Sequence, residues 1–144
     1  MTPEACYEKA RQWLVELFGV ERVVASPDEL TLGVAVGSAM AQVSVKPFGE
    51  EDSVLVTRAY VATGVDPTYE LLEFLLHENN RALFGGFGME GKGDVFFQHS
   101  VLGSTCDPPE LRSSVMAVVL IADKYDDQIT LRWGGERASD RALQ

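Results

Sequence analysis

The sequence is poor in the residues that build covalent and metal-bound frameworks. Only two cysteines and two histidines occur among its 144 residues. Cys6 and Cys106 lie far apart in the chain, and their spacing fits neither a disulfide framework nor a metal site. His77-Glu78 begins an H-E-x-x-H motif, but Arg81 stands where the second histidine is needed. We therefore expect no metal ion, no cofactor and no disulfide.

Positive charge and long apolar runs are also scarce. Lys and Arg total 12 against 22 Asp and Glu, which gives a formal charge of −10. No basic cluster offsets this acidity, so binding to nucleic acid is excluded. The longest apolar run, 115–122, is far shorter than the roughly 18 residues that cross a bilayer. The first residues lack a basic segment followed by an apolar one, so we expect no signal peptide and a cytoplasmic protein.

Three segments show helical signals. Thr2 and Pro3 begin a helix over 3–18, in which apolar residues recur at three- and four-residue spacing. A second helix is expected from Asp66-Pro67 to about Asn80. Its apolar arc is unusually wide, which indicates cover on more than one side, by another part of the chain or by a second subunit. A third helix is expected from Asp107-Pro108 to the glycines at 134–135, with 115–122 deeply packed.

The segments between these helices alternate apolar and polar residues, as half-buried strands do. The expected strands are 22–26, 30–36, 39–46, 53–62, 83–90 and 94–102. Gly37-Ser38 is a credible hairpin turn, and the other short links also favour an antiparallel meander. The sequence therefore predicts an α+β domain over residues 1–133 with the order α-β-β-β-β-α-β-β-α. Residues 134–144 are polar, and we expect them to form a loose tail.

The glycine-rich stretch 85–93 is the most motif-like part of the chain. Its residues from Gly86 match G-x-G-x-x-G and approach the phosphate-binding G-x-x-x-x-G-K-[ST]. Gly93 stands where a magnesium-binding hydroxyl is needed, and a strand follows instead of a helix. A hairpin in which bulky neighbours approach the backbone closely is the favoured interpretation. A small-molecule or nucleotide-binding site at 85–93, with Lys92 as its cation, is the alternative.

No catalytic constellation emerges from the remaining polar residues. Asp123, Asp126 and Asp127 offer oxygen ligands for Mg²⁺ or Ca²⁺, but a solvated helix face explains them better. Cys106 precedes a helix, where the positive backbone potential lowers a thiol pKa, so it is the more reactive of the two cysteines. Because no base is indicated beside it, we expect Cys106 to be a bystander and not a nucleophile.

Apolar residues on both faces of the predicted strands suggest a binding surface. A sheet covered by helices on one face alone leaves the second apolar set exposed, and large exposed apolar patches mark interaction sites. Helices on both faces are the alternative. The candidate partner-binding residues are Val54, Val56, Tyr60 and Phe96, and the candidate dimer contacts on the second helix are Tyr69, Leu72 and Leu76.

Several segments carry a family resemblance. They are Leu71-Leu72-Glu73-Phe74-Leu75-Leu76-His77-Glu78-Asn79-Asn80, Phe84-Gly85-Gly86-Phe87-Gly88, Gly93-Asp94-Val95, Pro109-Glu110-Leu111 and Ala122-Asp123-Lys124-Tyr125-Asp126. With the order of elements, they resemble the YbjN domain family, whose fold is that of type III secretion chaperones. The closing Arg132-Trp133-Gly134-Gly135 resembles cyanobacterial members.

The resemblance implies a protein without catalytic residues that forms homodimers and binds or regulates another polypeptide. We therefore expect a cytoplasmic, homodimeric module that is chaperone-like or regulatory, with itself and an unknown polypeptide as partners.

Overall fold

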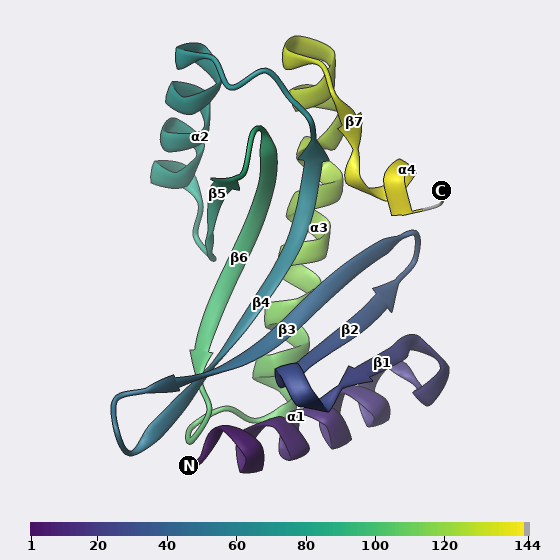
Figure 1. Ribbon diagram of the computed structural model, residues 1–144, viewed down its shortest axis with the longest axis vertical. Coiled ribbons are helices and arrows are strands. Elements are labelled where there is room, and N and C mark those ends of the chain that lie inside the picture. The colour runs from purple at the N-terminus through teal and green to yellow at the C-terminus, as the bar shows by residue number, and fades with distance from the viewer. Residues whose placement is uncertain (143–144) are drawn as a thin grey trace.

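The computed structural model describes residues 1–142 and has the predicted order of elements, with a short strand and helix added at the end (Figure 1). The helices are α1 (Pro3–Phe18), α2 (Tyr69–Arg81), α3 (Pro108–Trp133) and α4 (Ala138–Ala142), with the 3-10 turns η1 (Val20–Arg22) and η2 (Pro27–Glu29). The strands are β1 (Val23–Ser26), β2 (Thr31–Val36), β3 (Ala39–Phe48), β4 (Asp52–Thr63), β5 (Gly86–Glu90), β6 (Asp94–Leu102) and β7 (Glu136–Arg137).

Side-chain caps fix where the helices begin. The Thr2 hydroxyl accepts the backbone N–H of Ala5, and the Asp107 carboxylate accepts that of Glu110 at 2.8 Å. Each bond satisfies a donor that has no partner within the helix. The predicted start of α2 at Asp66-Pro67 is wrong, because the Thr68 hydroxyl caps this helix by accepting the N–H of Leu71.

The strands form one antiparallel sheet in the order β1-β2-β3-β4-β6-β5. Buried residues of α1, α2 and α3 pack against one face only, the inner face, and Figure 1 shows α3 running behind the strands. The inner side chains form two clusters. One lies under α1 and the first half of α3, and the other lies under α2 and the second half of α3. The outer face of the sheet has no helix on it within residues 1–142.

Two predicted segments differ from the structure. The strand expected over 83–90 begins only at Gly86, and Leu83 is fully exposed in the preceding loop. The Asn79 side chain sets this start, because its amide accepts the N–H of Phe87 at 2.6 Å and donates to the Phe87 carbonyl. Of the segment 134–144 expected as a loose tail, residues 136–137 instead pair with β4 as β7, which places Arg137 opposite Ala62, and residues 143–144 lie outside the described residues.

The sheet forks between β3 and β4. The β3–β4 ladder runs from Phe48↔Asp52 to Gln42↔Arg58 and ends there. Beyond it, residues 39–41 pair only with β2, and the register of β4 on β6 shifts between Tyr60 and Ala62. Such a bulge bends a strand and increases its twist. Figure 1 shows the β2–β3 hairpin swinging away from β4, with α3 behind the gap.

Candidate functional site

The outer face of the sheet gathers the four residues that the sequence suggests for partner binding. Val54, Val56 and Tyr60 project from β4 to this face, and Phe96 lies directly opposite Tyr60 on β6. Val24, Met40 and Leu102 extend the same apolar surface and are 62%, 49% and 41% exposed. The structure thus brings the four residues onto one uncovered face.

A polar and aromatic network covers part of this surface. The Arg58 guanidinium carbon lies 3.7 Å from the centre of the Phe96 ring, and its nitrogens bind Glu90 at 3.0 Å and Gln98 at 2.8 Å. Tyr60 donates to the Glu90 carboxylate and meets Phe96 edge-on. Burial, followed by the bond to Glu90, raises the pKa of the Tyr60 phenol. Phe96 is therefore only 9% exposed, and Val54 and Val56 form the more accessible part of the surface.

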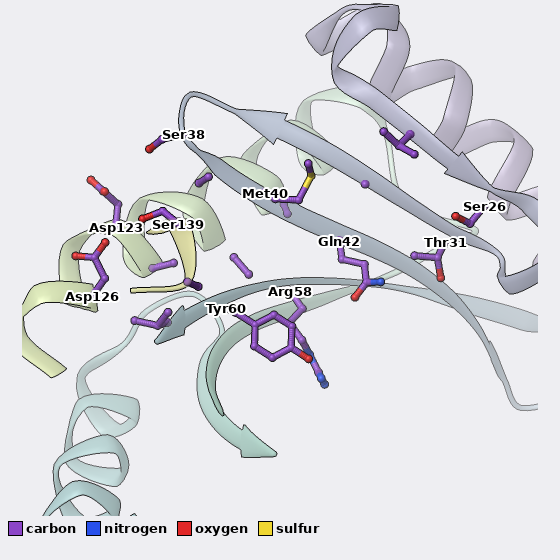
Figure 2. Close-up of a pocket in the computed structure, with 18 of the residues that line it drawn as sticks. Ser26, Thr31, Ser38, Met40, Gln42, Arg58, Tyr60, Asp123, Asp126 and Ser139 are labelled. Carbon is purple, nitrogen blue, oxygen red and sulfur yellow. The ribbon is translucent and has the colours of Figure 1, made fainter. Parts of the chain in front are cut away.

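A cleft opens where the sheet forks, and the outer face leads into it. Its volume is about 450 Å³, within the range of ligand pockets. In Figure 2 the strand that carries Met40 and Gln42 separates from the strand that carries Arg58 and Tyr60. Alanines of β3, β4 and α3 line the cleft, and the first residues of α4 border it.

The far wall of the cleft carries the carboxylates Asp123 and Asp126 of α3 (Figure 2). Asp126 is only 8% exposed, and within residues 1–142 its carboxylate accepts one hydrogen bond, from the N–H of Asp127. The Arg137 guanidinium binds Asp140 at 2.8 Å and Asp127 at 3.7 Å, and it forms no ion pair with Asp126. Burial therefore raises the pKa of Asp126. The expectation of a fully solvated acidic face is wrong for this residue.

The predicted dimer contacts lie together on α2 and are exposed. Tyr69, Leu72 and Leu76 are 79%, 44% and 68% exposed, whereas Leu71 and Leu75 enter the core. Within residues 1–142, α2 is thus covered on its inner side only. Edge strand β5 follows α2 in the chain and contacts it, and β5 has no strand neighbour other than β6 in this part of the chain. The wide apolar arc is therefore left partly uncovered.

The helix predicted to be deeply packed over 115–122 also has an exposed side. Val115 and Val118 are fully buried, but Leu120 is 59% exposed. Leu120 lines a second, shallower pocket of about 400 Å³ together with Leu83 and Phe84. The prediction that this segment is buried all round is wrong.

The glycine-rich stretch forms a hairpin, and neighbouring atoms lie so close to two of its glycines that a side chain would not fit there. A Cβ on Gly88 would lie 2.4 Å from the Phe96 ring, and one on Gly93 would lie 2.2 Å from the Val65 carbonyl oxygen. β6 follows the turn directly, so no helix N-terminus faces Lys92. The close-packing interpretation explains these glycines, and the nucleotide alternative gains no support.

The two thiols lie in the apolar core. Cys6 and Cys106 are 2% and 5% exposed. Burial raises the pKa of Cys106 to about 12, and the carboxylates of Glu110 and Asp107 add to the rise. The prediction that the helix start activates Cys106 is therefore wrong, because desolvation outweighs the backbone potential.

The side chains of His99 and Glu78 form hydrogen bonds within the fold. The His99 ring lies 2.9 Å from the Ser114 hydroxyl and stacks on Phe84, and burial lowers its pKa. Glu78 accepts a hydrogen bond from the Tyr125 hydroxyl. Within residues 1–142 no group of three metal-ligating side chains comes together. None of the helices in this part of the chain combines the length and apolar character needed to cross a membrane.

The residues suggested from the sequence lie together on the outer face and on α2, but the cleft was missed. The cleft depends on where the β3–β4 ladder stops and on a buried carboxylate of α3, and neither feature has a local sequence signal. The nearest hint was the trio Asp123, Asp126 and Asp127, which suggests a charged face but not which member is buried.

Chains from two solved protein complexes share this fold. One similar chain comes from the crystal structure of the ExsC-ExsE complex, with a TM-score of 0.68 at 13% identity over 85% of this chain and 95% of that chain. Another comes from the structure of the HopA1-SchA chaperone-effector complex, with a TM-score of 0.65 at 15% identity over 86% and 95%. No curated protein matches the sequence.

A protein-family model matches most of the chain. Residues 8–141 match TY-Chap1, described as T3SS (YopN, CesT) and YbjN peptide-binding chaperone 1. The chain therefore belongs to this family of peptide-binding chaperones. Membership confirms the resemblance stated from the sequence and supports a protein-binding role.

Proposed function

We propose that this protein is a cytoplasmic, homodimeric module that binds a client polypeptide, as a chaperone or as a regulator of that client. The observation that carries the proposal is an uncovered sheet face with apolar side chains in a member of a peptide-binding family. Exposed apolar surface of this kind is typical of interaction sites.

The client surface is proposed to be centred on Val54 and Val56, with Tyr60 and Phe96 at its polar end. These side chains come from neighbouring strands, so one extended segment can contact all of them. Aromatic and arginine residues beside an apolar patch are typical of the groups that contribute most to protein binding. Arg58 and Tyr60 place such groups next to the valines.

The dimer contact is proposed to be the stripe of Tyr69, Leu72 and Leu76 on α2. Leu83, in the loop that follows α2, is also fully exposed. A second copy of the chain would cover this apolar surface and give α2 the further cover that its wide apolar arc requires.

Charge placed in either surface tests the proposal. Leu72→Glu is expected to give a folded monomer, because a carboxylate cannot be buried unpaired at a subunit contact. The oligomeric state is measured by light scattering, and folding by circular dichroism. Gln12→Glu, at an exposed position of α1, adds the same charge away from α2 and is the matched control, which should remain dimeric. A Leu72→Glu protein that stays dimeric would refute the assignment of the dimer contact.

The client surface is tested in the same way, by placing a carboxylate on β4. Val56→Glu is expected to reduce the polypeptide captured from the host's lysate by about tenfold, without loss of the dimer. Arg112→Glu on α3 makes a larger charge change at an exposed position away from the outer face and serves as the control. Equal capture by the parent, Val56→Glu and Arg112→Glu proteins would contradict the proposed client surface.

A further inference from the structure

The fork in the sheet presents two strand edges to a ligand. Residues 39–41 of β3 and 59–61 of β4 border the cleft, and neither segment has a ladder partner on that side among residues 1–142. Unpaired N–H and C=O groups along a strand edge are a template for pairing with another extended chain. The backbone of the cleft therefore suits an extended polypeptide.

Small side chains leave room for such a segment. Ala41, Ala59 and Ala122 line the cleft and are at most 5% exposed. The next inner positions of β3 are Val43 and Val45, whose larger side chains fill the core under α1. The cleft, with a volume of about 450 Å³, therefore lies where the inner positions carry alanine and not the larger residues of the neighbouring core.

The walls of the cleft carry an excess of negative charge. Glu29, Asp123 and Asp126 line the cleft, and the one basic residue of its lining, Arg58, is bound to Glu90 and Gln98. Asp126 is 8% exposed and forms no ion pair within residues 1–142. A buried carboxylate without a counter-charge is costly, and a cation supplied by a ligand would relieve that cost.

We propose that the cleft binds an extended segment of the client that carries a Lys or Arg side chain, with its backbone along the edge of β4 and its cation beside Asp126. The inference rests on the proposed peptide-binding function and adds the chemistry of the bound segment. The edge of β4 is paired with β3 up to Arg58 and with β7 from Ala62, so the central residues of the segment would pair with the free part, 59–61.

Peptides of matched sequence test the charge preference. A fluorescent peptide of about six residues, the usual length of a strand, alternates Val and Thr around a central Arg. A second peptide has Gln in place of Arg. The parent protein is expected to bind the Arg peptide about tenfold more tightly, measured by fluorescence anisotropy. Equal affinity for the two peptides would overturn the proposal.

Variants of the two cleft carboxylates locate the preference. In the double variant Asp123→Asn/Asp126→Asn, the Arg and Gln peptides are expected to bind alike. The control Asp28→Asn/Asp66→Asn removes the same charge at exposed positions outside the cleft and should keep the preference. Loss of the preference in the control as well would assign it to net charge and overturn the proposal.

Amide hydrogen exchange tests the backbone contact. With the Arg peptide bound, exchange of backbone amides within 39–41 and 59–61 is expected to slow. Slowing confined to the edge strands β1 or β5 would overturn the proposal. The proposal would also be overturned if exchange at the cleft slowed when the protein concentration was raised without peptide. A second copy of the chain would then be the occupant.

The experiments distinguish failure of the cleft proposal from failure of the proposed peptide-binding function. A protein that binds the two peptides equally, yet loses its captured client on Val56→Glu, would retain the peptide-binding role and lose the basic segment in the cleft.

Discussion

The two faces of the sheet carry similar apolar residues, but those of the inner face are buried and those of the outer face are partly accessible. Along β4, Leu55, Ala59 and Val61 point inward and are at most 2% exposed, while Val54 and Val56 point outward and remain partly accessible. The difference lies in what covers each face, since three helices pack on the inner one. Apolar character alone therefore does not mark a core, and the uncovered set is available for a partner.

The largest expected difference between the faces is in stability. Leu55→Ala, on the inner face, is expected to lower the free energy of unfolding by about 2–5 kcal/mol through lost burial and the cavity left behind. Val56→Thr, on the outer face, should cost less than about 1 kcal/mol. Urea denaturation measures both. Equal losses would mean that the outer face is as firmly packed as the inner one.

The outer face has one tightly packed point, where the Phe96 ring lies over Gly88. Gly88→Ala would bring its Cβ within 2.4 Å of that ring, and we expect a loss of about 1–3 kcal/mol in the free energy of unfolding. Gly86→Ala is the control, because its Cβ would lie 3.5 Å from Asn79, an ordinary contact. Adding Phe96→Leu to Gly88→Ala should recover part of the loss. Similar stabilities of the two alanine variants would contradict this packing.

The smallest effect is expected in the cleft, and it depends on pH. Burial raises the pKa of Asp126, so the folded state holds this proton more tightly than the unfolded chain does. The stability from this group is complete below its unfolded pKa and is lost as the pH rises through the folded pKa. Asp126→Asn avoids that loss and should stabilise the protein by about 1 kcal/mol at neutral pH.

The gain from Asp126→Asn should shrink as the pH falls toward the range where the carboxyl is protonated. Urea denaturation of the parent and the variant at each pH measures it, with Asp123→Asn as the exposed control. A variant that is less stable than the parent at neutral pH would show that the carboxylate serves the fold and not a ligand.

The order of elements could be predicted because its signals are local. Apolar alternation marked the strands, and Thr2 and Asp107 marked two helix starts. The start of α2 was placed wrongly because Asp66-Pro67 and Thr68 both carry cap signals, and only the hydrogen bond to Leu71 distinguishes them. The local sequence is compatible with more than one helix start, and contacts in the folded protein determine which one is used.

The features that were missed depend on contacts between distant segments. The pairing of β7 requires a free edge on β4, and a segment as polar as 134–142 gives no sign of it. The burial of Cys106 reverses its expected reactivity, since desolvation is set by packing against α1 and not by its neighbours in sequence. The cleft follows from the fork, which no single segment encodes.

Native mass spectrometry of the protein, captured gently from its own host's lysate, tests the central claim most directly. The claim is that the uncovered surfaces serve a second copy of the chain and a client polypeptide. The predicted result is a complex of two 15.8 kDa chains with one further polypeptide in defined ratio. A bare chain, or a chain carrying only the mass of a small molecule, would contradict it.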